Sequence, residues 1–188
     1  MSFLLSSPGQ TNLPDVFSKY PERSALVLRL TDNILRGESS FSIAERELIF
    51  AFGSAQNACE FCFESHKPVA AAFGIDESVF DELQADIETA SVEQKLKPVL
   101  RFVKKLTQNP SRISQADADA IYDAGWDEQA FFDVVSICAI HNYLNRLVHG
   151  VGVDVGVDEA RRTGAELLPT IGYIGLAERL DSQIEPEK

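Results

Sequence analysis

Residues 47–66 read ELIFAFGSAQNACEFCFESH, a stretch that contains two of the three cysteines and one of the three histidines of the chain. Cys59 and Cys62 have the spacing C-x-x-C, His66 follows four residues later, and Glu47 precedes the first cysteine by twelve residues. On an α-helix of about 100° per residue, the two cysteines and the histidine fall on one face. The stretch therefore predicts a helical site where two thiols and a base meet without help from the rest of the fold.

The surroundings of these groups favour a reactive thiol. The thiolate is the reactive species, and a nearby imidazole or a helix N-terminus lowers the pKa of a thiol. His66 supplies the imidazole. If one helix ends near Asn57–Ala58 and a new helix starts at Cys59, the new helix supplies the N-terminus. The apolar neighbours of Glu47 predict a buried helix, and a carboxylate there is positioned to exchange a proton with Cys59 or His66.

The same stretch resembles the core motif of the alkyl hydroperoxide reductase D family, which is related to the carboxymuconolactone decarboxylases. The family pattern is a glutamate, eleven residues, and then C-x-x-C-x-x-x-H, and every spacing matches here. Well-studied members carry a histidine just before the second cysteine, where this chain has Phe61, so a proton relay through that position is absent. The segment HNYLNRLVHGVG, residues 141–152, is similar to one in the peroxidase-related branch of the family.

The resemblance implies an all-helical subunit in a homo-oligomer that reduces hydroperoxides with its thiols. It implies that Cys62 attacks the peroxide, that Cys59 resolves the sulfenic acid and exchanges with an external dithiol reductant, and that His66 and Glu47 handle protons. No flavin, haem or dinucleotide motif is present in the sequence, so no cofactor is expected.

Three other interpretations of the motif remain open. The pair could belong to a non-catalytic redox-sensing or interaction protein, or the chain could have a decarboxylase-like activity as in the sister family, which does not depend on this cysteine pair. Zinc is a third option, with Glu47 as fourth ligand beside Cys59, Cys62 and His66. Structural zinc sites usually carry a second C-x-x-C or H-x-x-x-H pair, which is lacking here, so redox use is favoured and no metal is expected.

A polar stripe crosses the apolar segment 127–148. His141, Asn145 and His149 recur at four-residue steps, and buried polar groups are normally paired, so a polar network at a helix or subunit interface is the favoured interpretation. The functional alternative is that His141 or Asn145 lines the thiol pocket. Cys138 lies in the same segment and is expected to be an inert buried thiol.

Composition narrows the classes of partner. The chain has 188 residues, which suits a single domain over 1–188, and a net charge of −12 from 29 acidic and 17 basic residues. That negative charge argues against nucleic acids and anionic membrane surfaces as binding partners. No apolar stretch reaches about 18 residues, and residues 1–10 lack a basic region, so neither a membrane span nor a signal peptide is expected, and the cytoplasm is the expected location.

The pattern of apolar and capping residues predicts an all-α fold. Helices are expected at about 22–36, 43–57, 59–74, 77–88, 92–107, 115–123 and 127–148. We expect a core over about 22–150, an irregular N-terminal arm over 1–20 with a short helical turn at 14–19, and a C-terminal tail over 150–188. The tail is predicted to be extended with a short final helix, packed on a neighbouring subunit or, equally, folded back on its own core.

Residues 45–66 and residues 130–151 show a weak internal sequence similarity. Both are apolar helical segments with an alanine-containing centre, and Asn57 would align with Asn142. This similarity suggests a duplicated helical unit in which only one copy keeps the reactive cysteine motif.

Overall fold

The computed structural model describes residues 2–6, 9 and 11–184, and within them the chain is all-helical, as predicted. The described part contains ten α-helices, one 3₁₀ turn and no strand. The elements are α1 (Leu13–Lys19), α2 (Pro21–Arg36), α3 (Ile43–Gln56), α4 (Glu60–Ala72), α5 (Ser78–Ala85), α6 (Leu96–Gln108), η1 (Pro110–Arg112), α7 (Gln115–Asp123), α8 (Glu128–Val151), α9 (Val157–Leu167) and α10 (Gly172–Asp181).

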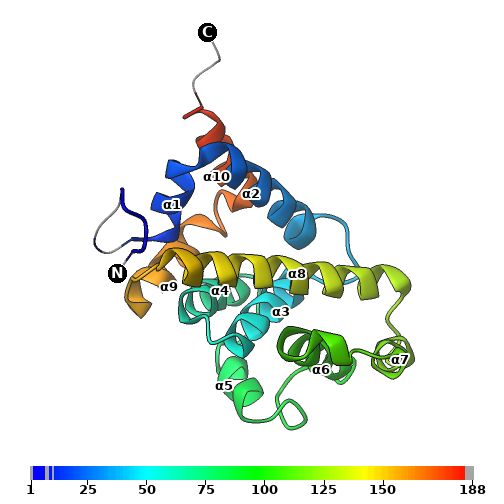
Figure 1. Ribbon diagram of the computed structural model, residues 1–188. Helices are drawn as coiled ribbons and strands as arrows, with labels where there is room; N and C mark the ends of the chain where they lie inside the picture. Colours follow the sequence, from blue (N-terminus) through cyan, green and yellow to red (C-terminus); the bar gives the residue numbers. More distant parts are fainter. Residues whose placement is uncertain (1, 7–8, 10, 185–188) are drawn as a thin grey trace.

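The long helix α8 runs across the middle of the molecule and separates two groups of helices (Figure 1). In that view α1, α2 and α10 lie above α8, while α3 to α6 lie below it. Helix α3 packs against α4 and α8, α9 packs against α4, and α10 packs against α2. The motif helices α3 and α4 are therefore covered on several sides by elements that lie far away in the sequence.

Local signals set the helix ends where the sequence predicts them. Ser42 forms a capping box with Glu45 at the start of α3, which satisfies backbone N–H groups that would otherwise lack partners. Gly37 follows the last residue of α2, and Asp127 caps α8 by accepting a hydrogen bond from the Ala130 N–H. The predicted helices all exist, and their observed bounds differ from the expected ones by a few residues.

Two prolines lie within helices. Pro98 is in the first turn of α6, where its missing N–H removes no intrahelical hydrogen bond. Pro68 lies within α4, which continues past it to Ala72.

The C-terminal segment differs from the expected extended tail. Residues 157–167 form α9, and α9 and α10 fold back on their own subunit, which is the second of the two predicted arrangements. Gly164 lies so close to α4 that a Cβ atom there would be 1.8 Å from the Ser65 carbonyl oxygen. Phe17 of α1 and Tyr173 and Leu180 of α10 join the same hydrophobic cluster as the motif helices.

Helix length and hydropathy also bear on membranes. Among the described residues, no helix combines the length and the apolar character that crossing a bilayer requires.

Candidate active site

A tight turn between α3 and α4 positions the first cysteine. Helix α3 ends at Gln56 and α4 begins at Glu60, so the break lies where the sequence predicts it. Ala58 has φ +52°, a left-handed conformation that is uncommon for a residue with a side chain, and the Cys59 N–H donates to the Ser54 carbonyl at 3.0 Å. Cys59 therefore occupies the N-cap of α4, while Cys62 lies in its first turn.

The two thiols are in contact. Cys59 Sγ and Cys62 Sγ share a hydrogen bond of 2.8 Å, and both cysteines are free. A disulfide bond is about 2.05 Å long, so a small approach of the sulfur atoms would join them. Both cysteines are buried, with 1% exposure for Cys59 and 3% for Cys62, so neither thiol is open to solvent.

The surroundings favour a thiolate on Cys59 and a protonated Cys62. The hydrogen bond with Cys62 lowers the pKa of Cys59, against the opposing effect of burial, and the backbone N–H of Cys62 at the start of α4 adds to the lowering. Burial raises the pKa of Cys62, and its hydrogen bond with Cys59 raises it further. Of the two thiols, Cys59 is therefore the one that ionises first, while Cys62 keeps its proton to higher pH.

Glu47 and His66 form a buried pair beside the thiols. Glu47 on α3 is fully buried, and its Oε2 lies 2.6 Å from His66 Nδ1 on α4. Burial raises the pKa of Glu47, but the charge and hydrogen bonding of His66 and Arg36 outweigh it and leave the pKa below its ordinary value. The ring of His66 stacks on Phe50 at a centroid distance of 3.8 Å, which fixes its plane.

Two further residues hold Glu47, and neither was predicted from the sequence. Arg36 at the end of α2 forms an ion pair with Glu47 Oε1 at 2.6 Å, although its Nη2 atom is not aligned for a hydrogen bond. The Tyr173 hydroxyl on α10 donates to the same oxygen at 2.9 Å and lies 3.5 Å from His66 Nδ1. Burial raises the pKa of Tyr173 well above its ordinary value, so this hydroxyl stays protonated and remains a donor.

Asn145 on α8 borders the thiols. Its amide makes a hydrogen bond that lowers the pKa of Cys62, although burial has the larger and opposite effect. The amide also donates to Ser54 Oγ at 3.0 Å and accepts from Asn57 Nδ2 at 2.8 Å. Of the predicted polar stripe, Asn145 therefore lies at the thiols, while His149 is exposed.

His141 belongs to a second polar cluster, one helical turn from Asn145. Its Nε2 lies 3.4 Å from Thr107 Oγ1, and Thr107 is also 3.4 Å from Cys138 Sγ. Burial lowers the pKa of His141 to about 3, so its ring is neutral. A Cβ at Gly53 would lie 2.3 Å from His141 Nε2, so only glycine leaves room for this imidazole. Burial raises the pKa of Cys138.

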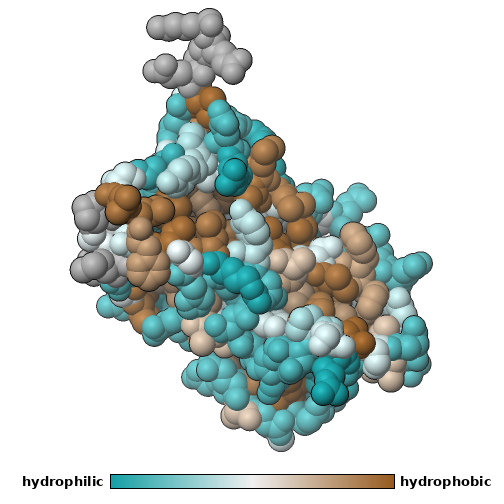
Figure 2. Space-filling view, viewed as in Figure 1, coloured by the Kyte–Doolittle hydropathy of each residue, from teal (hydrophilic) through white to brown (hydrophobic). Residues whose placement is uncertain are grey.

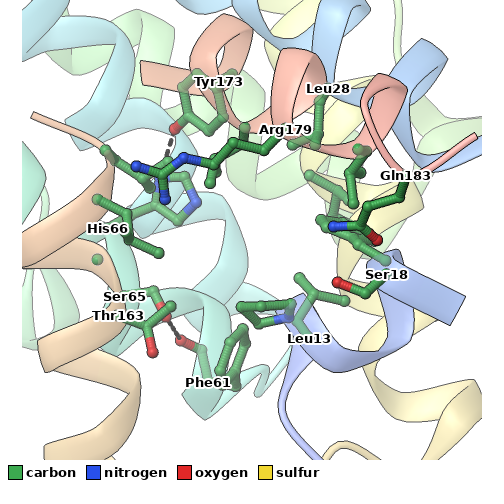
Figure 3. A pocket seen from close by; sticks show the side chains of 18 residues that line it. Leu13, Ser18, Leu28, Phe61, Ser65, His66, Thr163, Tyr173, Arg179 and Gln183 are labelled. Atoms are coloured by element: carbon green, nitrogen blue, oxygen red, sulfur yellow. Dashed lines mark hydrogen bonds between the residues drawn. The ribbon is translucent and has the colours of Figure 1, made fainter. Parts of the chain in front are cut away.

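A cavity of about 250 Å³ opens beside His66 (Figure 3). Its wall includes Phe61, Ser65 and His66 of α4, together with residues of α1, α2, α8, α9 and α10. Phe61, which stands where the family has a histidine, therefore contributes an apolar surface to this cavity. The cavity reaches the Glu47–His66 pair from the side of α10, because Tyr173 lines it as well.

The structure also bears on a metal site within the described residues. Among them, no three or more histidine, cysteine, aspartate or glutamate side chains gather where they could hold one metal ion.

Solved structures provide the comparison with known proteins. An uncharacterized peroxidase-related protein from Silicibacter sp. TM1040 superimposes with a TM-score of 0.72 at 21% identity, over 80% of this chain and 78% of that one. A second, described as an alkylhydroperoxidase AhpD core and an uncharacterized peroxidase-related protein from Ralstonia eutropha JMP134, gives a TM-score of 0.71, also at 21% identity, over the same shares of the two chains. This chain has the alkylhydroperoxidase D-like fold.

The resemblance found in residues 47–66 is thus confirmed at the level of the AhpD-like fold. No protein-family model matches the sequence, and no curated protein matches it either. At 21% identity the likeness extends to the fold alone, and the words "peroxidase-related" describe the two neighbours.

Proposed function

We propose that the protein is a thiol peroxidase that reduces organic hydroperoxides through Cys59 and Cys62. The observation that carries the proposal is the contact of the two sulfurs at 2.8 Å, one helical turn before a histidine that is paired with a buried carboxylate. Such a pair supports both a thiolate nucleophile and a thiol ready to resolve its oxidised form. The neighbours with the same fold carry peroxidase-related names, which agrees with this chemistry.

The first step is attack by the thiolate on the peroxide. The sulfur forms a bond to the terminal oxygen, the O–O bond breaks, and the cysteine becomes a sulfenic acid while the substrate leaves as an alcohol after taking up one proton. The pKa directions favour Cys59 as the attacking thiolate, which reverses the roles implied by the family resemblance. In this proposal His66, which lines the cavity, supplies the proton to the departing alkoxide.

The second step forms the disulfide. The Cys62 thiol loses its proton and attacks the sulfenic sulfur of Cys59, and the hydroxyl group leaves as water. An external dithiol then reduces the disulfide by exchange and becomes oxidised itself, which restores both thiols. The described hydrogen bonds include none between His66 and either sulfur, so a proton passing between them needs a bridging molecule or a side-chain rotation.

Exposed apolar surface supports a homo-oligomer. Leu26 and Leu30 on α2 are 69% and 53% exposed, and Phe132 on α8 is 65% exposed. Figure 2 shows apolar side chains gathered over the upper half of the view, around α1, α2 and α10, whereas the lower half is mainly hydrophilic. Exposed apolar patches commonly mark contacts between proteins. Light scattering at micromolar concentration that found a 20.7 kDa particle would contradict this part of the proposal.

We also propose a cytoplasmic location. A C-x-x-C pair that works by thiol–disulfide exchange suits a compartment that keeps thiols reduced.

A steady-state peroxidase assay tests the function. The purified protein is mixed with cumene hydroperoxide and dithiothreitol, and peroxide consumption is followed against a Cys59→Ser, Cys62→Ser double variant. We expect many turnovers per subunit from the parent protein and none from the double variant. If the pair oxidises once and peroxide consumption then stops despite excess dithiol, the redox-sensing alternative is favoured. If the parent consumes no more peroxide than the double variant and its thiols stay reduced, the peroxidase proposal is wrong.

A further inference from the structure

The cavity beside His66 has a lining that differs from the rest of this acidic protein. Among its 18 lining residues there is no aspartate and no glutamate, although the chain has 29 acidic residues and a net charge of −12. Most of the lining is apolar, with leucines from α1, α2, α8, α9 and α10, and the polar members other than His66 and Arg179 are uncharged hydroxyl and amide side chains. The lining itself therefore presents no carboxylate to a bound anion.

Arg179 supplies a positive charge at this cavity. It lines the cavity from α10 and is exposed, and in the part of the chain that the structure describes no carboxylate pairs with it. The contrast with nearby arginines is clear, because Arg29 pairs with Asp181 and Arg36 pairs with Glu47. A guanidinium at the rim of an apolar cavity is a suitable partner for a single carboxylate.

The size of the cavity exceeds what hydrogen peroxide needs. At about 250 Å³ it is close to the lower end of the range of roughly 300–1,000 Å³ for small-molecule sites. A small polar peroxide gains no binding free energy from leucine side chains. An alkyl chain gains about 25 cal/mol of binding free energy for each Å² of apolar surface that is removed from water. The cavity also extends away from His66 to Leu13, Ser18 and Gln183, as Figure 3 shows.

From these observations we infer that the cavity binds a single-chain organic acid, with the alkyl chain against the leucines and the carboxylate on Arg179. The inference rests on the proposed function in one respect: it makes the preferred substrate a hydroperoxide that carries a carboxylate, with its peroxide group at the His66 end. The site itself can be tested without turnover, using an unreactive acid.

Binding of decanoate, with decanol as its neutral counterpart, is measured by isothermal titration calorimetry on the full chain. We expect saturable binding of both ligands to the parent protein. Arg179→Gln is expected to weaken decanoate about tenfold and to change decanol less than twofold. The control is Arg162→Gln, which removes the same charge from α9 at a residue that pairs with Glu159 and Glu166 and does not line the cavity. This variant should bind both ligands as the parent does.

A second variant tests the apolar wall. Leu176→Asn places an amide among the leucines and should weaken decanoate and decanol alike. The inference is overturned if decanoate does not saturate, if Arg179→Gln and Arg162→Gln weaken it equally, or if Leu176→Asn leaves both ligands unaffected.

Measurements of peroxidase activity separate this inference from the proposed function. For a carboxylate-bearing hydroperoxide, Arg179→Gln should lower kcat/KM about tenfold, whereas Arg162→Gln should leave kcat/KM at the parent value. If the protein reduces cumene hydroperoxide but fails the decanoate tests, the proposed peroxidase function is supported and this inference is wrong. If it passes the decanoate tests but reduces no peroxide, the acid-binding site is supported and the proposed peroxidase function is wrong.

Discussion

Two buried histidines pack against the ring of Phe50 and differ in their hydrogen-bond partners. His66 stacks on Phe50 and places its Nδ1 2.6 Å from the Glu47 carboxylate. His141 meets the edge of the same ring at 5.9 Å and has only a hydroxyl and amides as partners, from Thr107, Asn142 and Asn145. Each histidine also has a cysteine nearby, so the two clusters contain similar groups in different arrangements.

The difference between the clusters shows what a carboxylate adds to a buried histidine. Glu47, held by Arg36 and Tyr173, gives His66 an anionic partner at a cavity, which suits proton transfer. Without such a partner, burial lowers the pKa of His141 to about 3 and keeps its ring neutral throughout the physiological range. The carboxylate therefore distinguishes the two clusters, although each of them places a histidine near a thiol.

Removing either sulfur of the motif should have the largest effect. Cys59→Ser and Cys62→Ser are both expected to abolish steady-state peroxide reduction, because turnover requires the disulfide. A dimedone-type trap separates the roles. Cys62→Ser should retain one turnover and yield a labelled sulfenic acid on Cys59, whereas Cys59→Ser should yield no label. The opposite labelling would restore the assignment implied by the family resemblance, with Cys62 as the attacking thiol.

Removing the anionic partner should make His66 resemble His141. Glu47→Gln is expected to lower kcat/KM by roughly 10²-fold or more, as the loss of a general acid–base pair does. The substitution also leaves the Arg36 guanidinium without its buried counter-ion, so the variant should be compared with His66→Asn, which keeps the Glu47–Arg36 pair. Similar losses in two folded variants, checked by circular dichroism, would support a catalytic pair. Full activity in His66→Asn would show that the pair is structural.

The sequence predicted the part of this site that local spacing determines. Glu47, Cys59, Cys62 and His66 lie within one helix–turn–helix, so helical periodicity and one turn bring them together. Arg36 and Tyr173 come from α2 and α10, which reach Glu47 only through tertiary packing. Tyr173 also lies in the segment 150–188, which was predicted to be an extended tail with a short final helix, and no local pattern marks it as a partner of Glu47.

The pH dependence of activity tests whether Tyr173 belongs to the site. Its hydroxyl donates to the Glu47 carboxylate and so stabilises the charged form. Tyr173→Phe keeps the ring and removes that donor, so the pKa of Glu47 should rise from its lowered value, and the acid limb of the kcat/KM profile should move to higher pH. The lost hydrogen bond to a charged group should also cost about 1.5–3 kcal/mol in the free energy of unfolding. An unshifted acid limb would limit Tyr173 to packing.

The pH dependence of stability tests the neutral state of His141. Its pKa is about 3 in the folded chain and about 6.5 when unfolded, so only the unfolded chain takes up the proton between these values. The contribution of His141 to the free energy of unfolding is therefore fully present above about pH 6.5. It falls as the pH decreases, by about 2 kcal/mol between pH 7 and pH 5. Urea unfolding at both pH values should show that His141→Gln loses about 2 kcal/mol less than the parent protein over this interval. Equal losses would mean that His141 is protonated in the folded state.

Cys138 should give the smallest effect, because its cluster has the thiol and the histidine but lacks the carboxylate. Burial raises the pKa of its thiol, which keeps the proton on sulfur and makes it a poor nucleophile. Cys138→Ala is therefore expected to leave kcat/KM unchanged, at a cost of about 1 kcal/mol in the free energy of unfolding, a typical value for one substitution. Peptide mapping after mild peroxide treatment should find the Cys59–Cys62 disulfide with Cys138 reduced. A main product that links Cys138 to either motif cysteine would mean that the second cluster also takes part in the redox chemistry, and that a raised thiol pKa does not keep a cysteine out of it.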